Sequence, residues 1–221
     1  PGSTLLPYTT LFRSWGVGAN TGVALADNSG TVVSTTSTNN RVINIINGNL
    51  FFSSGSGTKG IYEITGTPTV SGQTASVVIP ETGSPYGFAI NAAGTVAYIA
   101  DDTSATTGVE KWINTAGTWT DAYNFTVPTS GAGTGDLIRG LAVDWATNTI
   151  YATGANSGNT ASDIFKAVDT GSTATLTEIA ASGTGTIFRG LVLVPSSSPV
   201  PEPASLGMLS LSGLLLLKRR R

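Results

Sequence analysis

The sequence predicts an all-β protein, organised as a partial β-propeller of about three four-stranded blades and followed by a C-terminal hydrophobic helix. Three observations lead to this prediction: a composition that favours strands and turns, a repeated unit of about 50 residues, and an apolar run near the end of the chain. Of 221 residues, 28 are Gly, 23 Ser and 34 Thr, whereas charged residues make up only 11%. Thr favours strands, and Gly and Ser favour turns.

A strand-like segment in which Gly precedes apolar residues occurs three times. The copies lie at residues 85–91, 139–144 and 189–194. Their glycines, at positions 87, 140 and 190, are 53 and 50 residues apart. Three further strand-like segments follow each of the first two copies, separated by turn-forming residues. Four short strands in about 50 residues are typical of a propeller blade. The sequence therefore predicts blades over residues 41–82, 86–130 and 137–184.

Other segments do not complete a blade by themselves. Residues 187–194 would begin another blade, whose remaining strands must come from elsewhere. Residues 23–26 and 31–34 are also strand-like, and either supply two of those strands or belong to an earlier blade. We expect the strands at 86–92, 139–145 and 189–194 to be innermost, because Gly and Ala in the first two allow close approach near the central channel.

The repeated strands resemble the blades of NHL, YVTN and SMP-30-like propellers. In those families a Gly-aliphatic-Ala strand ending in Asn or Asp leads into a second strand with a central Tyr, as at 87–98 and 140–151 here. The resemblance covers about residues 41–195 and implies a propeller fold. It does not extend to the metal ligands of the SMP-30-like members, which are not identifiable.

The two ends of the chain are set apart from the propeller fragment, residues 15–194. Residues 1–14 include a segment that resembles the translation of a common sequencing adapter, so we interpret them as an assembly artefact and expect a true N-terminus upstream. Residues 195–203 are a Pro- and Ser-rich linker. Residues 204–221 comprise an apolar stretch and a basic tail. The apolar part, 204–217, predicts one helix of about 21 Å, short for a permanent membrane anchor.

The C-terminal segments resemble the PEP-CTERM sorting signal of Gram-negative bacteria. The signal consists of Pro201, Glu202 and Pro203, then the apolar stretch, then the basic residues Lys218, Arg219, Arg220 and Arg221. The resemblance implies export, transient insertion in the inner membrane, processing by an exosortase-type membrane enzyme, and delivery to the cell surface or extracellular matrix. The alternative is a plain tail anchor behind a Pro-rich linker.

The residue inventory excludes several kinds of chemistry. The chain has no His and no Cys, which excludes Ser-His-Asp triads, thiol nucleophiles and Cys/His zinc sites. No basic patch lies outside the tail, so nucleic-acid binding is not expected. We predict no cofactor and no metal, with Asp101 and Asp102 as weak calcium candidates in what otherwise is a solvated turn. Arg139 and Arg189 occupy equivalent positions before inner strands, and either pair with carboxylates or meet an anionic ligand.

Two function classes remain open. The first is a non-enzymatic surface or exopolysaccharide-matrix protein, in which the propeller is a binding platform for exopolysaccharide or a surface protein. The second is a hydrolase- or lactonase-like propeller enzyme whose site lies in missing blades. Such enzymes gather unlike polar groups from several blades. Because the inner-strand positions here are alike and mostly apolar, we predict that the chain is not an enzyme.

Overall fold

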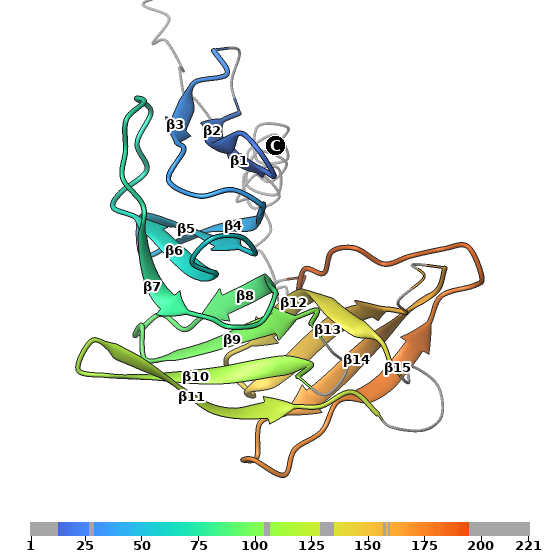
Figure 1. Cartoon of the computed structure of the whole chain (residues 1–221). Coiled ribbons are helices and arrows are strands. Elements are labelled where there is room, and N and C mark those ends of the chain that lie inside the picture. Colours follow the sequence, from blue (N-terminus) through green and yellow to red (C-terminus); the bar gives the residue numbers. More distant parts are fainter. Residues whose placement is uncertain are drawn as a thin grey trace, which may run out of the picture.

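A computed structural model describes residues 13–26, 29–103, 107–128, 135–156, 158 and 160–194. These residues form fifteen strands and no helix, arranged in four antiparallel sheets that follow one another in chain order (Figure 1). Within this part of the chain, no helix has the length and apolarity needed to cross a membrane. The predicted helix at 204–217 and the sorting residues lie outside the described residues.

Each sheet is built from consecutive strands, every one paired with the next. The first sheet contains β1 (Trp15–Gly18), β2 (Gly22–Leu25) and β3 (Val32–Ser34). The second contains β4 (Asn40–Ile46), β5 (Asn49–Ser54), β6 (Gly60–Ile64) and β7 (Ser76–Pro80). The third contains β8 (Pro85–Ile90), β9 (Val96–Asp101), β10 (Val109–Thr115) and β11 (Thr118–Phe125). The fourth contains β12 (Leu137–Asp144), β13 (Thr149–Ala155), β14 (Ser162–Val168) and β15 (Thr177–Ala181).

The three predicted four-stranded units are confirmed as the second, third and fourth sheets. Of the two alternatives for residues 23–26 and 31–34, the structure selects the earlier unit, because these residues fall in β2 and β3 of the first sheet. The architecture is therefore all-β and propeller-like.

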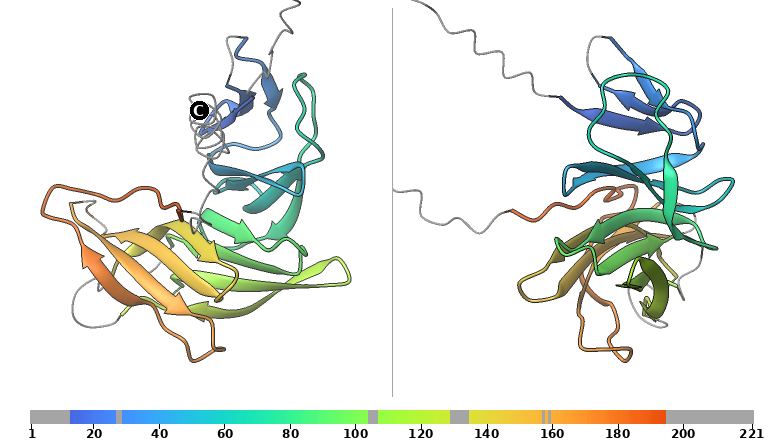
Figure 2. Two further views of the ribbon diagram at one scale, coloured as in Figure 1. Left: turned by 180° about the vertical axis from the view of Figure 1, so that it is seen from behind. Right: turned by 90° about the vertical axis from the view of Figure 1, so that its left-hand side faces the viewer.

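The predicted inner strand at 189–194 is wrong, since the described residues after β15 contain no strand. The chain instead returns along the sheets toward β8 and β12 (Figure 2). On the way, the backbone N–H of Phe188 donates to the side-chain hydroxyl of Ser162, the first residue of β14, at 2.6 Å and not to a backbone carbonyl of a strand ladder. Apolar residues that suit a strand do not form one without a ladder partner.

The first strands of successive sheets lie against one another, as predicted for innermost strands. A Cβ atom added at Gly87 of β8 would lie 2.7 Å from the Arg139 carbonyl oxygen and 2.9 Å from the Leu141 backbone nitrogen, both on β12. On the other side of β8, Asn44 of β4 donates its side-chain amide to the Phe88 carbonyl at 3.0 Å. Only a residue without Cβ permits this approach of β8 to β12.

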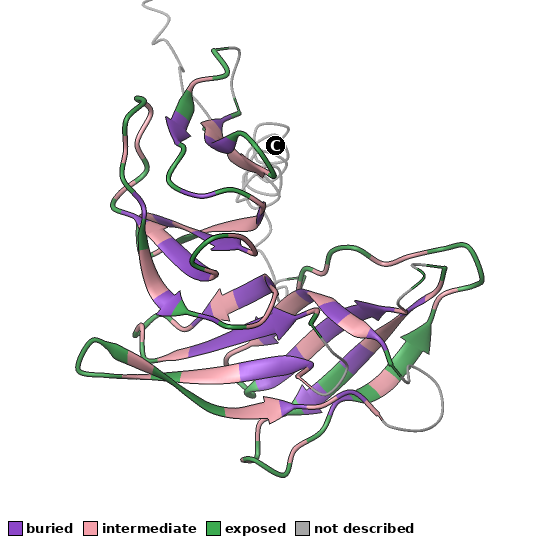
Figure 3. Ribbon diagram, viewed as in Figure 1, coloured by how far each residue is buried: buried purple, intermediate pink, exposed green. Residues whose placement is uncertain are grey.

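The core is divided into three apolar clusters, one between each pair of consecutive sheets (Figure 3). Strands in the middle of the chain contribute to two clusters at once. In β9, Ile99 faces the second sheet while Tyr98 and Ala100 face the fourth. Since side chains alternate between the two faces of a strand, both faces of β9 are buried, and its sequence is a continuous apolar run.

The turn between the first two strands of a sheet is held by a polar residue at the end of the first strand. The Asn91 side-chain oxygen accepts hydrogen bonds from the backbone N–H groups of Thr95 and Val96, at 2.8 and 3.2 Å. The equivalent Asp144 accepts from the Ala146 N–H at 3.0 Å and the Thr147 hydroxyl at 2.7 Å. These two recurring polar residues therefore have structural roles.

Candidate functional site

The candidate site lies where the innermost strands begin. Arg41 is the second residue of β4, Tyr86 the second of β8, and Arg139 the third of β12. Because β4, β8 and β12 lie next to one another, these three side chains from three sheets converge. Near the start of the first strand, β4 and β12 each have an arginine and β8 has a tyrosine. Two cations therefore lie beside one aromatic ring.

Both arginines contact the same ring and the same carboxylate. The guanidinium carbons of Arg41 and Arg139 lie 4.0 and 5.5 Å from the centre of the Tyr86 ring. The Asp102 carboxylate lies 3.5 Å from Arg41 Nη1 and accepts a 3.1 Å hydrogen bond from Arg139 Nε. Arg41 also donates to the Ser84 hydroxyl at 2.7 Å, and its buried Nε has no partner. The carboxylate pairing expected for Arg139 is confirmed.

A pocket of about 150 Å³ opens beside this cluster. Arg189, on the segment that returns after β15, lines it together with Arg41, Tyr86 and Arg139. Thr153 lines it as well, and its buried hydroxyl has no hydrogen-bond partner. Guanidinium groups bind carboxylates and phosphates through paired N–H donors, and a hydroxyl supplies a further contact for a sugar-like ligand. The pocket is therefore suited to a small, oxygen-rich anion.

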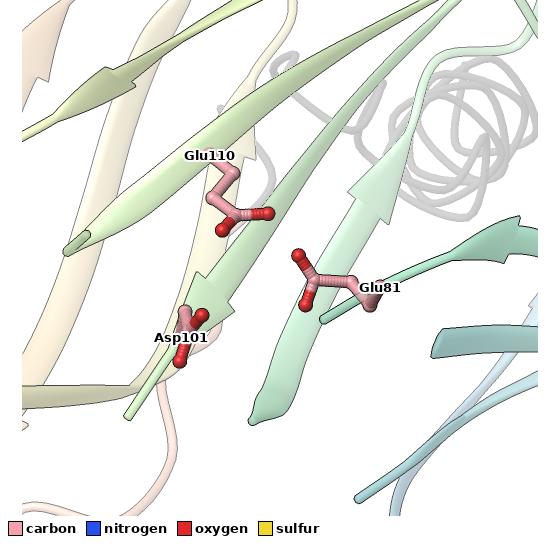
Figure 4. Close-up of side chains that lie close together, drawn as sticks. All are labelled: Glu81, Asp101 and Glu110. Carbon is pink, nitrogen blue, oxygen red and sulfur yellow. The ribbon is translucent and has the colours of Figure 1, made fainter. Parts of the chain in front are cut away.

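The two acidic residues predicted as weak calcium candidates do not act together. Asp101 is the last residue of β9 and Asp102 follows it, so their side chains leave the backbone in opposite directions. Asp102 joins the arginines. Asp101 instead lies near Glu81 and Glu110, with one carboxylate oxygen of each residue within 4.8 Å of the others (Figure 4). The Asp101–Asp102 pairing is therefore wrong.

We call Glu81, Asp101 and Glu110 the acid triad. Their exposed fractions are 8%, 0% and 7%. Asp101 Oδ1 accepts hydrogen bonds from the Ser84 and Thr103 backbone N–H groups at 3.0 and 2.6 Å. Glu110 Oε2 accepts from the indole N–H of Trp112 at 3.0 Å. In contrast, Glu81 Oε2 and Asp101 Oδ2 are buried with no hydrogen-bond partner.

Burial is the main influence on the pKa of the two glutamates of this triad. It raises the pKa of Glu81 far above its usual range, and the hydrogen bond and negative charge of Glu110 raise it further. Burial also raises the pKa of Glu110, although the hydrogen bonds from Glu81 and Trp112 oppose this. Removing a carboxylate from water disfavours its charged form, so Glu81 and Glu110 favour their protonated forms unless a cation compensates.

Sequence reasoning singled out Arg139, Arg189, Asp101 and Asp102, but missed Arg41, Tyr86, Glu81 and Glu110. A signal for Glu110 was present: charged residues make up only 11% of the chain, yet Glu110 is the second residue of a strand and directly follows the apolar Val109. The predicted sorting residues Pro201, Glu202 and Pro203, and the basic tail, lie outside the described residues.

No protein-family model matches the sequence, and no curated protein does. Among solved structures, the chain is similar to a putative 6-phosphogluconolactonase from Bacteroides uniformis, with a TM-score of 0.54 and 14% identity over 83% of this chain and 57% of the other. A second structure, a putative 6-phosphogluconolactonase from Bacteroides fragilis, has a TM-score of 0.46 and 16% identity, over 83% and 54% of the two chains. The chain thus spans little more than half the length of either, and the first likeness shows the fold.

This likeness corrects the prediction that the chain is not an enzyme. That prediction rested on the middles of the inner strands, which are alike and mostly apolar. The polar groups gather instead at the strand starts, where Arg41 and Arg139 contact both the Tyr86 ring and the Asp102 carboxylate. The fold is one that a protein described as a lactonase also has, so a non-enzymatic platform is no longer the expectation.

Proposed function

We propose that the chain carries a lactonase-like hydrolase propeller whose pocket binds a small anionic sugar lactone. The observation that supports this best is the convergence of Arg41 and Arg139 on Tyr86 and Asp102, beside a pocket that Arg189 also lines. The structural neighbours described as putative 6-phosphogluconolactonases suggest the substrate class, a phosphorylated sugar lactone.

Hydrolysis of such a lactone needs few groups. The oxygen of a water bonds to the carbonyl carbon, the ring C–O bond breaks, and the ring oxygen leaves as a hydroxyl, which yields a hydroxy acid. Negative charge develops on the carbonyl oxygen, and a guanidinium beside it stabilises that charge. In our proposal Arg139 has this role and Arg189 binds the phosphate. Asp102 accepts the proton of the attacking water and returns it to the ring oxygen as the C–O bond breaks, so that the carboxylate is restored.

The proposal is tested by binding and turnover on the full chain. Arg139→Met should weaken binding of 6-phosphogluconate, a stable product, by about tenfold or more, since a charge-assisted contact is lost. The control Lys166→Met removes one cation from β14, outside the residues that line the pocket, and should bind as wild type does. Titration calorimetry with 6-phosphogluconate measures binding, and an acid-release assay with the lactone measures turnover, for the wild type and both variants. Equal affinity in wild type and Arg139→Met would refute the pocket assignment.

We also propose that the chain is exported and sorted by its C-terminal segments. The support is the order of Pro201, Glu202 and Pro203, an apolar stretch and a basic tail, which resembles a signal read by exosortase-type enzymes. An exported hydrolase of this kind would act on sugars of the cell envelope or its matrix.

Replacement of Pro201, Glu202 and Pro203 by alanines tests the sorting proposal in a host that has an exosortase. Unprocessed protein should remain in the inner-membrane fraction, because the prolines keep the segment extended for processing. Wild-type trimming and surface delivery of this variant would favour the plain tail anchor instead.

A further inference from the structure

We propose that the acid triad, Glu81, Asp101 and Glu110, binds a calcium ion between the second and third sheets. The site is separate from the pocket beside Arg41 and Arg139, which we call the arginine pocket. The triad contains Asp101, whereas the arginines of the pocket pair with Asp102. It would be a structural site, since its residues come from β9, β10 and the connection between β7 and β8.

The arrangement of oxygens suits one ion. One oxygen of each carboxylate lies within 4.8 Å of the other two. Calcium binds oxygen at about 2.3–2.6 Å, so two ligands of the same ion can lie up to about 5 Å apart. Figure 4 shows the Glu81 and Glu110 carboxylates directed toward each other, with that of Asp101 beside them.

Burial without partners is the second, independent observation. Glu81 is 8% exposed and Asp101 fully buried, yet Glu81 Oε2 and Asp101 Oδ2 accept no hydrogen bond. No salt bridge found in the described residues involves the triad. Buried carboxylate oxygens are otherwise paired with donors or coordinate metals. Two unsatisfied oxygens in one cluster of three acids therefore indicate a cation as the missing partner.

The chemistry of the ligands favours calcium over other ions. The triad offers hard oxygen ligands only, and zinc and other later transition metals prefer the imidazole and thiolate groups that this chain lacks. Magnesium usually keeps several waters and demands near-octahedral geometry, whereas calcium accepts flexible sets of carboxylates. A dry site with three carboxylates from separate segments suits calcium better.

An ion there would fasten the connection between two sheets. A Cβ at Gly83 would lie 1.7 Å from Asp101 Oδ2, so this connection passes directly against the carboxylate. Ser84, in the same connection, donates its N–H to Asp101 Oδ1. Ser84 also accepts from Arg41 of the pocket cluster. Calcium would thus hold the segment from which the pocket's Tyr86 strand begins.

The neighbouring sheet contains a natural comparison. Asp163 is the second residue of β14, as Glu110 is of β10, and Asp136 precedes β12. By strand register Glu110 pairs with Ile99 and Asp163 with Gly154, which places Asn156 where the third sheet has Asp101. This two-acid version lacks the third carboxylate, so we propose one calcium site and not two.

Terbium luminescence and thermal unfolding of the full chain test the proposal. Terbium replaces calcium in oxygen sites, and Trp112, hydrogen-bonded to Glu110, is placed to sensitise its emission. We expect Trp-sensitised emission that calcium displaces with a dissociation constant between about 10⁻⁵ and 10⁻³ M. We also expect calcium at about 100 times that value to raise Tm by roughly 5–10 °C.

Variants separate this site from other sources of binding. Glu81→Gln and Asp101→Asn should abolish the calcium-dependent rise in Tm, and Trp112→Phe should lose the sensitised emission while keeping the rise. Asp144→Asn is the matched control, since it also removes one carboxylate. The Asp144 carboxylate lies at the end of β12 and accepts hydrogen bonds from Ala146 and Thr147 in the following turn. Wild-type protein whose Tm and emission do not respond to the ions would overturn the proposal. So would triad variants that respond as the control does.

Discussion

Asp169 connects the third and fourth sheets through three side chains. Its carboxylate accepts hydrogen bonds of 2.5 Å from the Tyr98 and Tyr123 hydroxyls, and one of 2.6 Å from Lys111. Tyr98, Tyr123 and Lys111 belong to β9, β11 and β10, whereas Asp169 directly follows β14. Burial would raise the pKa of Asp169, but these hydrogen bonds outweigh it and lower the pKa to about 2, from 3.8.

The lowered pKa predicts a specific loss of stability in acid. A carboxyl whose folded pKa is depressed stabilises the fold above its unfolded pKa, and this contribution disappears as the pH falls through the folded value. For Asp169 the window runs from about 3.8 down to about 2, and the contribution is about 2 kcal/mol. The side chain is only 6% exposed, so solvent screening reduces this little.

We therefore expect Asp169→Asn to be less stable than wild type at neutral pH, with the difference shrinking by about 2 kcal/mol as the pH approaches 2. Urea unfolding of both proteins at several pH values measures it. A difference that does not change with pH would show that the carboxylate charge is not what stabilises the contact.

At the scale of the element, the approach of β8 to β12 depends on one missing side chain. Gly87→Ala would place a methyl group 2.7 Å from the Arg139 carbonyl oxygen and 2.9 Å from the Leu141 nitrogen. Both atoms are backbone and cannot rotate away, so the two strands must separate. Overpacking of this kind costs about 1–3 kcal/mol.

Gly16→Ala in β1 is the control for this prediction, because a Cβ there meets nothing within 4 Å. We expect Gly16→Ala to change stability by less than about 0.5 kcal/mol, and Gly87→Ala to lower it by several times more. Chemical denaturation with both variants compares them directly. Because Arg139 belongs to the candidate site, the Gly87 variant should also weaken ligand binding there.

The strands could be predicted because their signals are local. The repeat placed the second to fourth sheets, and the Asn91 and Asp144 turn caps follow from polar residues at strand ends. The strand predicted within residues 187–194 is absent because a strand also needs a partner strand, and the sequence pattern carries no information on whether one is present. Within a single unit, sequence pattern and structure therefore agree closely.

The sites could not be predicted to the same extent, because each joins different units. Asp102 meets Arg41 and Arg139 across 61 and 37 residues of sequence. Glu81 lies at the end of the blade predicted over residues 41–82, in the connection that leads from β7 to the next sheet. Asp101 and Asp102 are adjacent, but their side chains point to opposite faces of the sheet. Asp101 therefore joins the acid triad, whereas Asp102 joins the two arginines.

At the scale of the whole molecule, the described residues form a chain of sheets and not one shared core. Each apolar cluster contains residues of two consecutive sheets and none from a third. The arginine pocket is the exception, since it gathers side chains from β4, β8 and β12. The polar site thus links three sheets that the apolar packing links only in pairs.

Separate clusters between neighbours also have an evolutionary consequence. A sheet inserted by gene duplication must match only the two faces that it touches, and it leaves every other cluster as it was. Arrays with nearest-neighbour contacts tolerate changes in repeat number for this reason. A lineage can therefore lengthen or shorten such a protein by whole units, while selection on Arg41, Tyr86 and Arg139 preserves the one arrangement that requires three adjacent units to stay in order.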